Sequence, residues 1–260
     1  MITMIKTGIA SVTFRKKSPA EIIKLTKKSG LSAIEWAGDV HILPGNTDLA
    51  KEIRDMTISQ GLEVSSYGSY YCIGSGNDIR PYLETAKALG GKTMRIWAGN
   101  RPSASLSASE RENLVSEAKK ISDISKEYNM TLSLECHSCS LTDCLESQLM
   151  FLNEVNKDNF MTYWQALLEV PREGQMETLK AVYNTSKLTN IHVYFHDENR
   201  NRITLREGEE YWKERLGFLK ASDFGGYALI EFVRDDAEES FLDDAKILTN
   251  LIKSHEEKIQ

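Results

Sequence analysis

The sequence is poor in cysteine, and its cysteines follow no regular framework. Four cysteines occur in 260 residues at irregular spacing: Cys72, Cys136, Cys139 and Cys144. Small secreted domains held by disulfides carry denser, paired cysteines, whereas thiols stay reduced in the cytoplasm. The pattern favours a cytoplasmic protein over a disulfide scaffold, and Cys136-His137-Ser138-Cys139 lacks the second ligand pair that a structural zinc site needs.

Long apolar runs and basic clusters are also missing. The longest apolar strings, such as residues 227–230, are far shorter than the roughly 20 residues that span a bilayer. The first residues lack the basic region and long apolar stretch of a secretory signal. The formal net charge is −6, and residues 15–17 form the only Lys/Arg run longer than two. Because nucleic-acid binders use many basic side chains on phosphates, we expect neither nucleic acid nor a membrane as partner.

What the sequence does have is a regular alternation of β-rich runs and amphipathic helices, repeated eight times. The expected strands are 7–14, 32–36, 63–67, 93–97, 131–136, 161–165, 191–196 and 228–233. The expected helices are 19–29, 48–60, 78–89, 109–128, 142–155, 173–184, 207–221 and 237–256. Ser109 and Glu112 form a capping-box pattern, and Gly30, Gly61 and Gly90-Gly91 stand where helices end.

Strands that alternate with single helices imply right-handed βαβ units and a parallel sheet. The sequence therefore predicts an α/β fold, a single (β/α)8 TIM barrel over residues 1–260. An open doubly wound sheet is the alternative, but no Gly-x-Gly-x-x-Gly motif follows the first strand.

Three expected strands carry ionisable side chains where a barrel strand should be apolar. Glu135, His196 and Glu231 lie at or near the ends of the fifth, seventh and eighth strands. Strand ends meet at the active face of such barrels, and a buried carboxylate needs a partner or a metal. With one more oxygen ligand, this set suits Mn²⁺, Mg²⁺ or Co²⁺. Such an ion could polarise a carbonyl while Glu135 and Glu231 transfer a proton through an enediolate, giving an isomerase or epimerase.

Several ordered segments over residues 7–245 resemble the xylose isomerase-like sugar phosphate isomerase/epimerase family. They are Ile34–His41 with Pro44-Gly45, Ser66–Tyr71, Ile96–Gly99, Leu134-Glu135 with His137, Leu141–Asp143, Tyr163–Gln165 and Ile230–Val233. The resemblance implies metal ligands on strands five to eight: a Glu, an Asp, a His and a Glu. Glu135, His196 and Glu231 match three of them, and His192, four residues earlier, is the deeper alternative to His196. Gln165 stands where many relatives have the Asp, so it is the expected fourth ligand, with an oxygen but no charge.

The resemblance also implies substrate contacts. Arg202 matches an arginine that contacts substrate in ketose 3-epimerases of the family, and His41 matches a substrate-facing loop histidine. Trp97 could form an aromatic wall for a sugar ring, and His137 faces the same way as Glu135 because it is two residues further on. Glu35 and Arg95 sit in apolar strands and could form an ion pair inside the barrel.

The expected function is thus a metal-dependent isomerase or epimerase of a small carbohydrate, polyol or keto acid. A non-catalytic sugar-binding barrel and a related dehydratase remain open, the first because Gln165 removes a charge from the ligand set. A phosphodiesterase of the endonuclease IV type is disfavoured, because the chain has only five histidines and is acidic. Many relatives are dimers or tetramers, which makes a homo-oligomer an open expectation.

Overall fold

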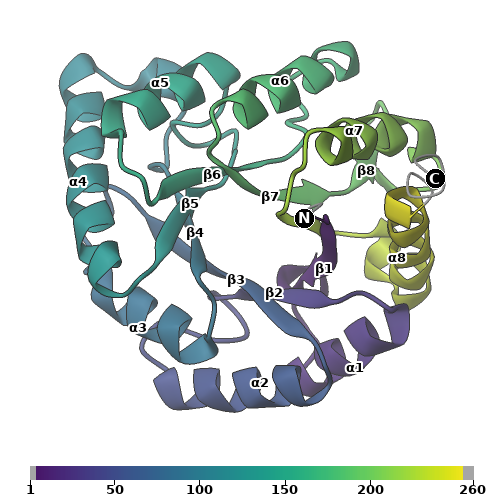
Figure 1. The fold of residues 1–260 in the computed structure, drawn as a ribbon. Helices are drawn as coiled ribbons and strands as arrows, with labels where there is room; N and C mark the ends of the chain where they lie inside the picture. Colours follow the sequence, from purple (N-terminus) through teal and green to yellow (C-terminus); the bar gives the residue numbers. More distant parts are fainter. Residues whose placement is uncertain (1–3, 254–260) are drawn as a thin grey trace.

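The computed structural model describes residues 4–253 and shows a closed barrel of eight parallel strands surrounded by eight helices (Figure 1). Around the barrel the strands follow the order β1-β10-β7-β6-β5-β4-β3-β2, so successive barrel strands are neighbours and the last, β10, closes the barrel against β1. A separate two-stranded antiparallel ladder, β8-β9, follows β7. The predicted (β/α)8 barrel is therefore confirmed, and the open sheet is excluded.

The elements agree closely with the expected ranges. The barrel strands are β1 (Lys6–Ala10), β2 (Ala33–Ala37), β3 (Glu63–Cys72), β4 (Thr93–Trp97), β5 (Thr131–Leu134), β6 (Phe160–Trp164), β7 (Leu188–Val193) and β10 (Tyr227–Ile230). The short ladder comprises β8 (Phe195–His196) and β9 (Arg202–Ile203). The helices are α1 (Pro19–Ser29), α2 (Thr47–Ser59), α3 (Arg80–Leu89), α4 (Ala108–Glu127), α5 (Leu145–Val155), α6 (Arg172–Asn184), α7 (Glu209–Ala221) and α8 (Glu238–Lys253). Three short 3₁₀ turns are η1 (Ser11–Phe14), η2 (Ser103–Ser105) and η3 (Arg234–Asp236). The last three residues of the helix expected at 237–256 lie outside the described residues.

The first strand is shorter than expected, because beyond Ala10 side-chain hydroxyls, rather than its backbone, form the hydrogen bonds to the neighbouring segments. The Ser11 hydroxyl accepts a hydrogen bond from the Ala37 backbone N–H at 2.8 Å. The Thr13 hydroxyl accepts one from the Phe232 N–H at 3.0 Å. Because these hydroxyls satisfy neighbouring backbone groups, the chain can leave the strand and form η1.

The expected capping box is displaced by two residues. Ser107, rather than Ser109, caps α4, and the Glu110 carboxylate accepts a hydrogen bond from the Ser107 N–H at 2.7 Å. Both Ser-x-x-Glu pairs fit the pattern, and the helix begins at the earlier one. Of the glycines expected at helix ends, Gly30, Gly61 and Gly90 have left-handed φ angles, whereas Gly91 does not.

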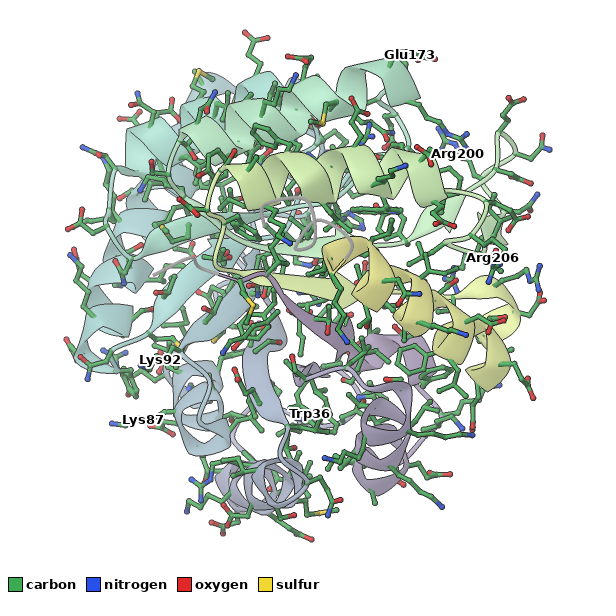
Figure 2. All side chains as sticks on the ribbon, turned by 45° about the vertical axis from the view of Figure 1, so that its right-hand side comes forward. Trp36, Lys87, Lys92, Glu173, Arg200 and Arg206 are labelled. Atoms are coloured by element: carbon green, nitrogen blue, oxygen red, sulfur yellow. The ribbon has the colours of Figure 1, made fainter. Side chains whose placement is uncertain are left out.

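Apolar side chains fill the space between the barrel and the helices, and charged side chains lie outside. Trp36 on β2 is fully buried, whereas Lys87, Lys92, Glu173, Arg200 and Arg206 lie at the periphery (Figure 2). No helix in residues 4–253 is long and apolar enough to cross a membrane.

Asp244 on α8 is a buried carboxyl whose ionisation should destabilise the fold. Burial raises its pKa from 3.8 to about 6, although the Leu205 backbone N–H donates a hydrogen bond to it at 2.8 Å. In the native protein this group keeps its proton to a higher pH than in the unfolded chain. Its contribution to stability is therefore complete below about pH 4 and is lost as the pH rises through about 6.

We expect Asp244→Asn, which keeps the acceptor for Leu205, to raise the free energy of unfolding at pH 7 by about 1–3 kcal/mol. The difference from the wild type should vanish near pH 4. Urea denaturation at several pH values would measure it, with the exposed Glu239→Gln on the same helix as control. A gain that is the same at pH 4 and pH 7 would contradict the assignment.

Candidate metal centre and cavity

Glu35 and Arg95 form an ion pair inside the barrel, as expected from the sequence. The Arg95 Nε lies 3.0 Å from the Glu35 Oε1, and both side chains are at least 98% buried. Hydroxyls of Ser66 and Tyr163 each donate to Glu35 Oε2 at 2.8 Å. Burial alone would raise the pKa of Glu35, but Arg95 and His192 outweigh burial and hold it far below its usual range. Glu35 is therefore a permanent anion beneath the active face.

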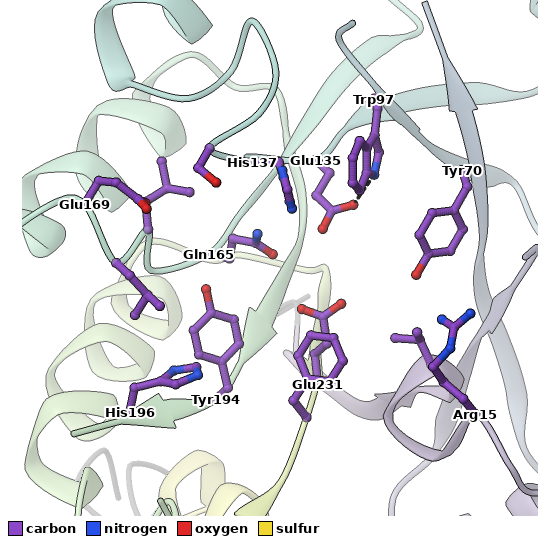
Figure 3. A pocket seen from close by; sticks show the side chains of 15 residues that line it. Arg15, Tyr70, Trp97, Glu135, His137, Gln165, Glu169, Tyr194, His196 and Glu231 are labelled. Atoms are coloured by element: carbon purple, nitrogen blue, oxygen red, sulfur yellow. Dashed lines mark hydrogen bonds between the residues drawn. The ribbon is translucent and has the colours of Figure 1, made fainter. Parts of the chain in front are cut away.

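Arg95 also contacts Glu135 and so links the ion pair to the ends of the strands. Its Nη1 lies against the Glu135 Oε2. The indole Nε1–H of Trp97 donates to the same oxygen at 2.6 Å (Figure 3). The Glu135 carboxylate, which directly follows β5, is thus oriented by two donors from β4.

His192 on β7 lies between Glu35 of the internal ion pair and Glu231 at the end of its strand. Its Nδ1 is 3.2 Å from the Glu231 Oε2 and 2.8 Å from the Gln165 Oε1, whereas its Nε2 is 3.4 Å from the Glu35 Oε1. Burial lowers the pKa of His192, but Glu231 and Glu35 outweigh burial and raise it to about 9. The same pairing keeps the pKa of Glu231 below its usual range, although burial acts in the opposite direction.

These side chains form a site that fits a divalent cation. Within residues 4–253, Glu135, His192 and Glu231 each offer one ligand atom, and the three atoms lie within 4.8 Å of one another. Gln165 is adjacent, because its side-chain oxygen faces His192. The Nε2 of His192 has no hydrogen-bond partner with good geometry, but it faces the Glu35 carboxylate. Metal-binding histidines commonly use such a carboxylate to orient the ring. Binding of a cation to His192 would release its proton.

The histidine in this cluster is His192 and not His196, which the sequence pattern favoured. In a continuous strand the two would face the same way, with His196 nearer the strand end. However, β7 ends at Val193, and the chain turns through Tyr194 into the β8-β9 ladder. In Figure 3 the Tyr194 ring lies between His196 and Glu231. We therefore replace His196 by His192 in the proposed ligand set of Glu135, Gln165, His192 and Glu231.

A cavity of about 420 Å³ opens above this cluster, and two of the expected substrate residues line it. Trp97 and His137 form one wall, with stacked rings whose centroids are 4.3 Å apart. Burial lowers the pKa of His137, and the Cys139 backbone N–H donates to its Nδ1 at 3.3 Å. A neutral His137 accordingly carries its proton on Nε2, where it can donate to a ligand. Glu135, Gln165 and Glu231 also line the cavity.

The other two expected substrate residues, His41 and Arg202, do not line this cavity. His41 is buried, and its Nδ1 is hydrogen-bonded to the Ser11 hydroxyl at 2.9 Å. Arg202 forms an ion pair with Asp236 at 2.8 Å, and its guanidinium lies 4.2 Å from the centroid of the Phe232 ring. The resemblance to the family was the only basis for expecting these two residues at the substrate site. In this chain their loops place both side chains outside the cavity lining. Phe232 lines the cavity, and the Arg202 guanidinium packs against the Phe232 ring.

Sequence reasoning missed Arg15, Tyr70, Tyr194 and Phe232, all of which line the cavity. Tyr70 and Phe232 have φ angles of 57° and 58°, which are uncommon for bulky residues and often occur at functional sites. Tyr70 lies where the β3-β4 register shifts. No sequence pattern marks these backbone angles. The position of Arg15 directly after the strand expected at 7–14 could have indicated that it lies at the cavity, because strand ends meet at the active face.

Gln165 sets the charge of the ligand set. We expect Gln165→Glu to tighten Mn²⁺ binding about tenfold, because added ligand charge strengthens binding of hard cations. The metal-free variant should melt at a lower temperature, because the Gln165 amide donates to the Cys136 carbonyl at 2.5 Å and a carboxylate cannot. Calorimetric titration and thermal melts would measure both effects. Gln148→Glu is the control: its amide donates to the Thr162 hydroxyl at 2.8 Å, so the variant should lose stability without gaining metal affinity.

Comparison with known proteins agrees with this architecture. The chain is 23% identical to a curated 3-dehydroshikimate dehydratase of Bacillus anthracis, over 94% of this chain and 97% of that protein. Among solved structures, the probable 3-DHS dehydratase AsbF of Bacillus anthracis, described as involved in petrobactin synthesis, superposes with a TM-score of 0.81 at 20% identity. That match covers 95% of this chain and 99% of the other. A D-allulose 3-epimerase from Methylomonas sp. gives a TM-score of 0.73 at 17% identity, covering 97% and 98% of the two chains.

The sequence profile of one family matches most of the chain, from residue 23 to residue 251. This confirms the resemblance inferred from the strand-end motifs. The chain belongs to the xylose isomerase-like TIM barrel family.

Proposed function

We propose that this protein is a divalent-metal-dependent enzyme that removes a proton next to the carbonyl of a small polyhydroxylated substrate. The observation that carries the proposal is the cluster of Glu135, His192 and Glu231 at the base of the cavity. Buried carboxylates at the active face of a barrel are paired or bind a cation, and here two of them lie with a histidine nitrogen close enough together to share one ion. Their position beneath an open cavity favours a catalytic role over a structural one.

Metal binding and proton transfer can each be assigned to particular residues of the cluster. Glu135, Gln165, His192 and Glu231 would hold the ion, which when bound polarises the substrate carbonyl and acidifies the neighbouring C–H. Because the pKa of Glu231 is lowered, this residue is a carboxylate at neutral pH and can accept the proton. In Figure 3 Glu135 and Glu231 approach the cavity from opposite sides. Proton removal by one and return by the other gives epimerisation or aldose–ketose isomerisation.

The dehydratase is the second candidate, and the similarity to a 3-dehydroshikimate dehydratase over nearly the full length of both proteins favours it. Elimination begins with the same proton transfer. The enolate then expels a β-hydroxyl group, which leaves as water after taking up a proton. A hydrogen bond from the His137 Nε2–H would assist that departure. Both reactions therefore need the same cluster and differ in what the rest of the cavity binds.

The test is solvent exchange at the acidified carbon. Protein supplied with Mn²⁺, Mg²⁺ or Co²⁺ would be incubated in D₂O with a panel of ketoses, aldoses and 3-dehydroshikimate. Deuterium incorporation seen by NMR reports removal and return of a proton at that carbon, as in epimerisation or isomerisation, whereas elimination leaves no site for deuterium and is followed by its product. A new sugar resonance then identifies an epimerase or isomerase, and near-ultraviolet absorption of a dihydroxybenzoate identifies a dehydratase. Stoichiometric sugar binding without exchange or product would instead support the non-catalytic sugar-binding barrel.

A further inference from the structure

Arg15 is the only lysine or arginine among the described residues that line the cavity. It directly follows η1 at the active face of the barrel, and half of its side chain is exposed. In Figure 3 its guanidinium points into the cavity beside the Tyr70 hydroxyl, across from the Glu231 carboxylate. A cation thus faces the space that a substrate would occupy.

The buried carboxylates of the site do not need Arg15 as a counter-ion. Glu135 has Arg95 as its partner, and Glu231 has His192. The one described salt bridge of Arg15 joins its Nη2 to the Asp39 Oδ2 at 2.6 Å. An exposed pair of this kind contributes little to stability. It does hold the guanidinium at the cavity rim, while the group carries further N–H donors.

We propose that Arg15, together with the Tyr70 hydroxyl, binds a carboxylate of the substrate. The substrate class is then a polyhydroxylated keto acid rather than a neutral sugar. A planar guanidinium donates two parallel hydrogen bonds to a carboxylate, and a tyrosine hydroxyl can add a third. The carboxylate would sit at the rim, so that the carbonyl of the same molecule lies over the cluster of Glu135, His192 and Glu231. This inference rests on the proposed function and narrows it toward the dehydratase.

The experiment compares two ligands that differ in charge. Calorimetric titration of the Mn²⁺-loaded protein would measure the affinity for shikimate and for its methyl ester. We expect the wild type to bind the acid about 10- to 100-fold more tightly, the range for hydrogen bonds to a charged group. Arg15→Gln should remove this preference. Arg15→Lys should keep part of it, because an ammonium retains the charge but not the paired donors.

Lys16→Ala is the matched control, since Lys16 is the exposed neighbour in the same basic run and does not line the cavity. It should keep the full preference for the acid. Equal affinity of the wild type for both ligands, no binding of shikimate, or an unchanged preference in Arg15→Gln would each overturn the proposal. Exchange or product formation across the substrate panel of the proposed function, together with metal stoichiometry, measured on the same wild-type preparation, tests the proposed function separately. Their success without a carboxylate preference would refute the role of Arg15 alone.

Discussion

Glu231→Gln should reduce turnover by about 10²- to 10⁴-fold at saturating metal, the usual contribution of a positioned proton acceptor. The amide has nearly the shape of the carboxylate but cannot take up the proton. Its loss of charge should also weaken metal binding, so the assay needs Mn²⁺ well above the dissociation constant of the variant. Steady-state kinetics on the substrate identified by the exchange experiment would give kcat and KM separately.

The fold should survive this substitution, because Glu35 remains beside His192. Circular dichroism and a thermal melt would verify that the variant is native. Glu169→Gln removes a carboxylate that lines the same cavity but lies outside the metal cluster, so its kcat should change less than about threefold. Full activity of a folded Glu231→Gln protein would refute the assignment of this residue as proton carrier.

Arg95→Met should lower the free energy of unfolding by about 3–5 kcal/mol, the cost of removing one partner from a buried ion pair. Arg95 is 2% exposed and contacts the carboxylates of both Glu35 and Glu135. Without the guanidinium, two buried anions would lose their shared cation. Urea denaturation at neutral pH would measure the effect.

A double variant separates lost charge pairing from lost packing. If pairing dominates, Glu35→Gln combined with Arg95→Met should be more stable than Arg95→Met alone, because one uncompensated anion is gone. If the double variant is no more stable, the cost comes from packing. A change below about 1 kcal/mol in Arg95→Met would show that the buried network is not needed for stability.

The fold could be predicted well because its signals are local and repeated. On α8, for example, the apolar residues Phe241, Ala245 and Leu248 recur at helical spacing and are buried, whereas Ile252 on the same face is partly exposed. Helix boundaries differ from expectation by only a few residues, since caps and turns are encoded by neighbouring residues. Where two local patterns competed, as with Ser107 and Ser109 before α4, the sequence did not decide between them.

The ligand set was predictable only in part. Glu135 and Glu231 interrupt apolar strands, and such an interruption is visible in the chain. The choice between His192 and His196 depended on where β7 stops pairing, and that point is set by contacts with β6 and β10. The pairing of Glu35 with Arg95 was foreseen, because side chains from alternate strands share a layer in a barrel. That Arg95 also contacts Glu135 was not foreseen.

The sequence by itself determined the barrel, the face that carries the chemistry, and the acidic pair at its centre. Periodicity and strand-end residues specify these features, and both are read along the chain. The tertiary structure alone decided that His192 joins Glu135 and Glu231. It also placed Arg15, Tyr70 and Phe232 around one cavity, and left His41 and Arg202 outside its lining. Loops after different strands meet there in space, and their backbone angles depend on contacts between segments far apart in the chain.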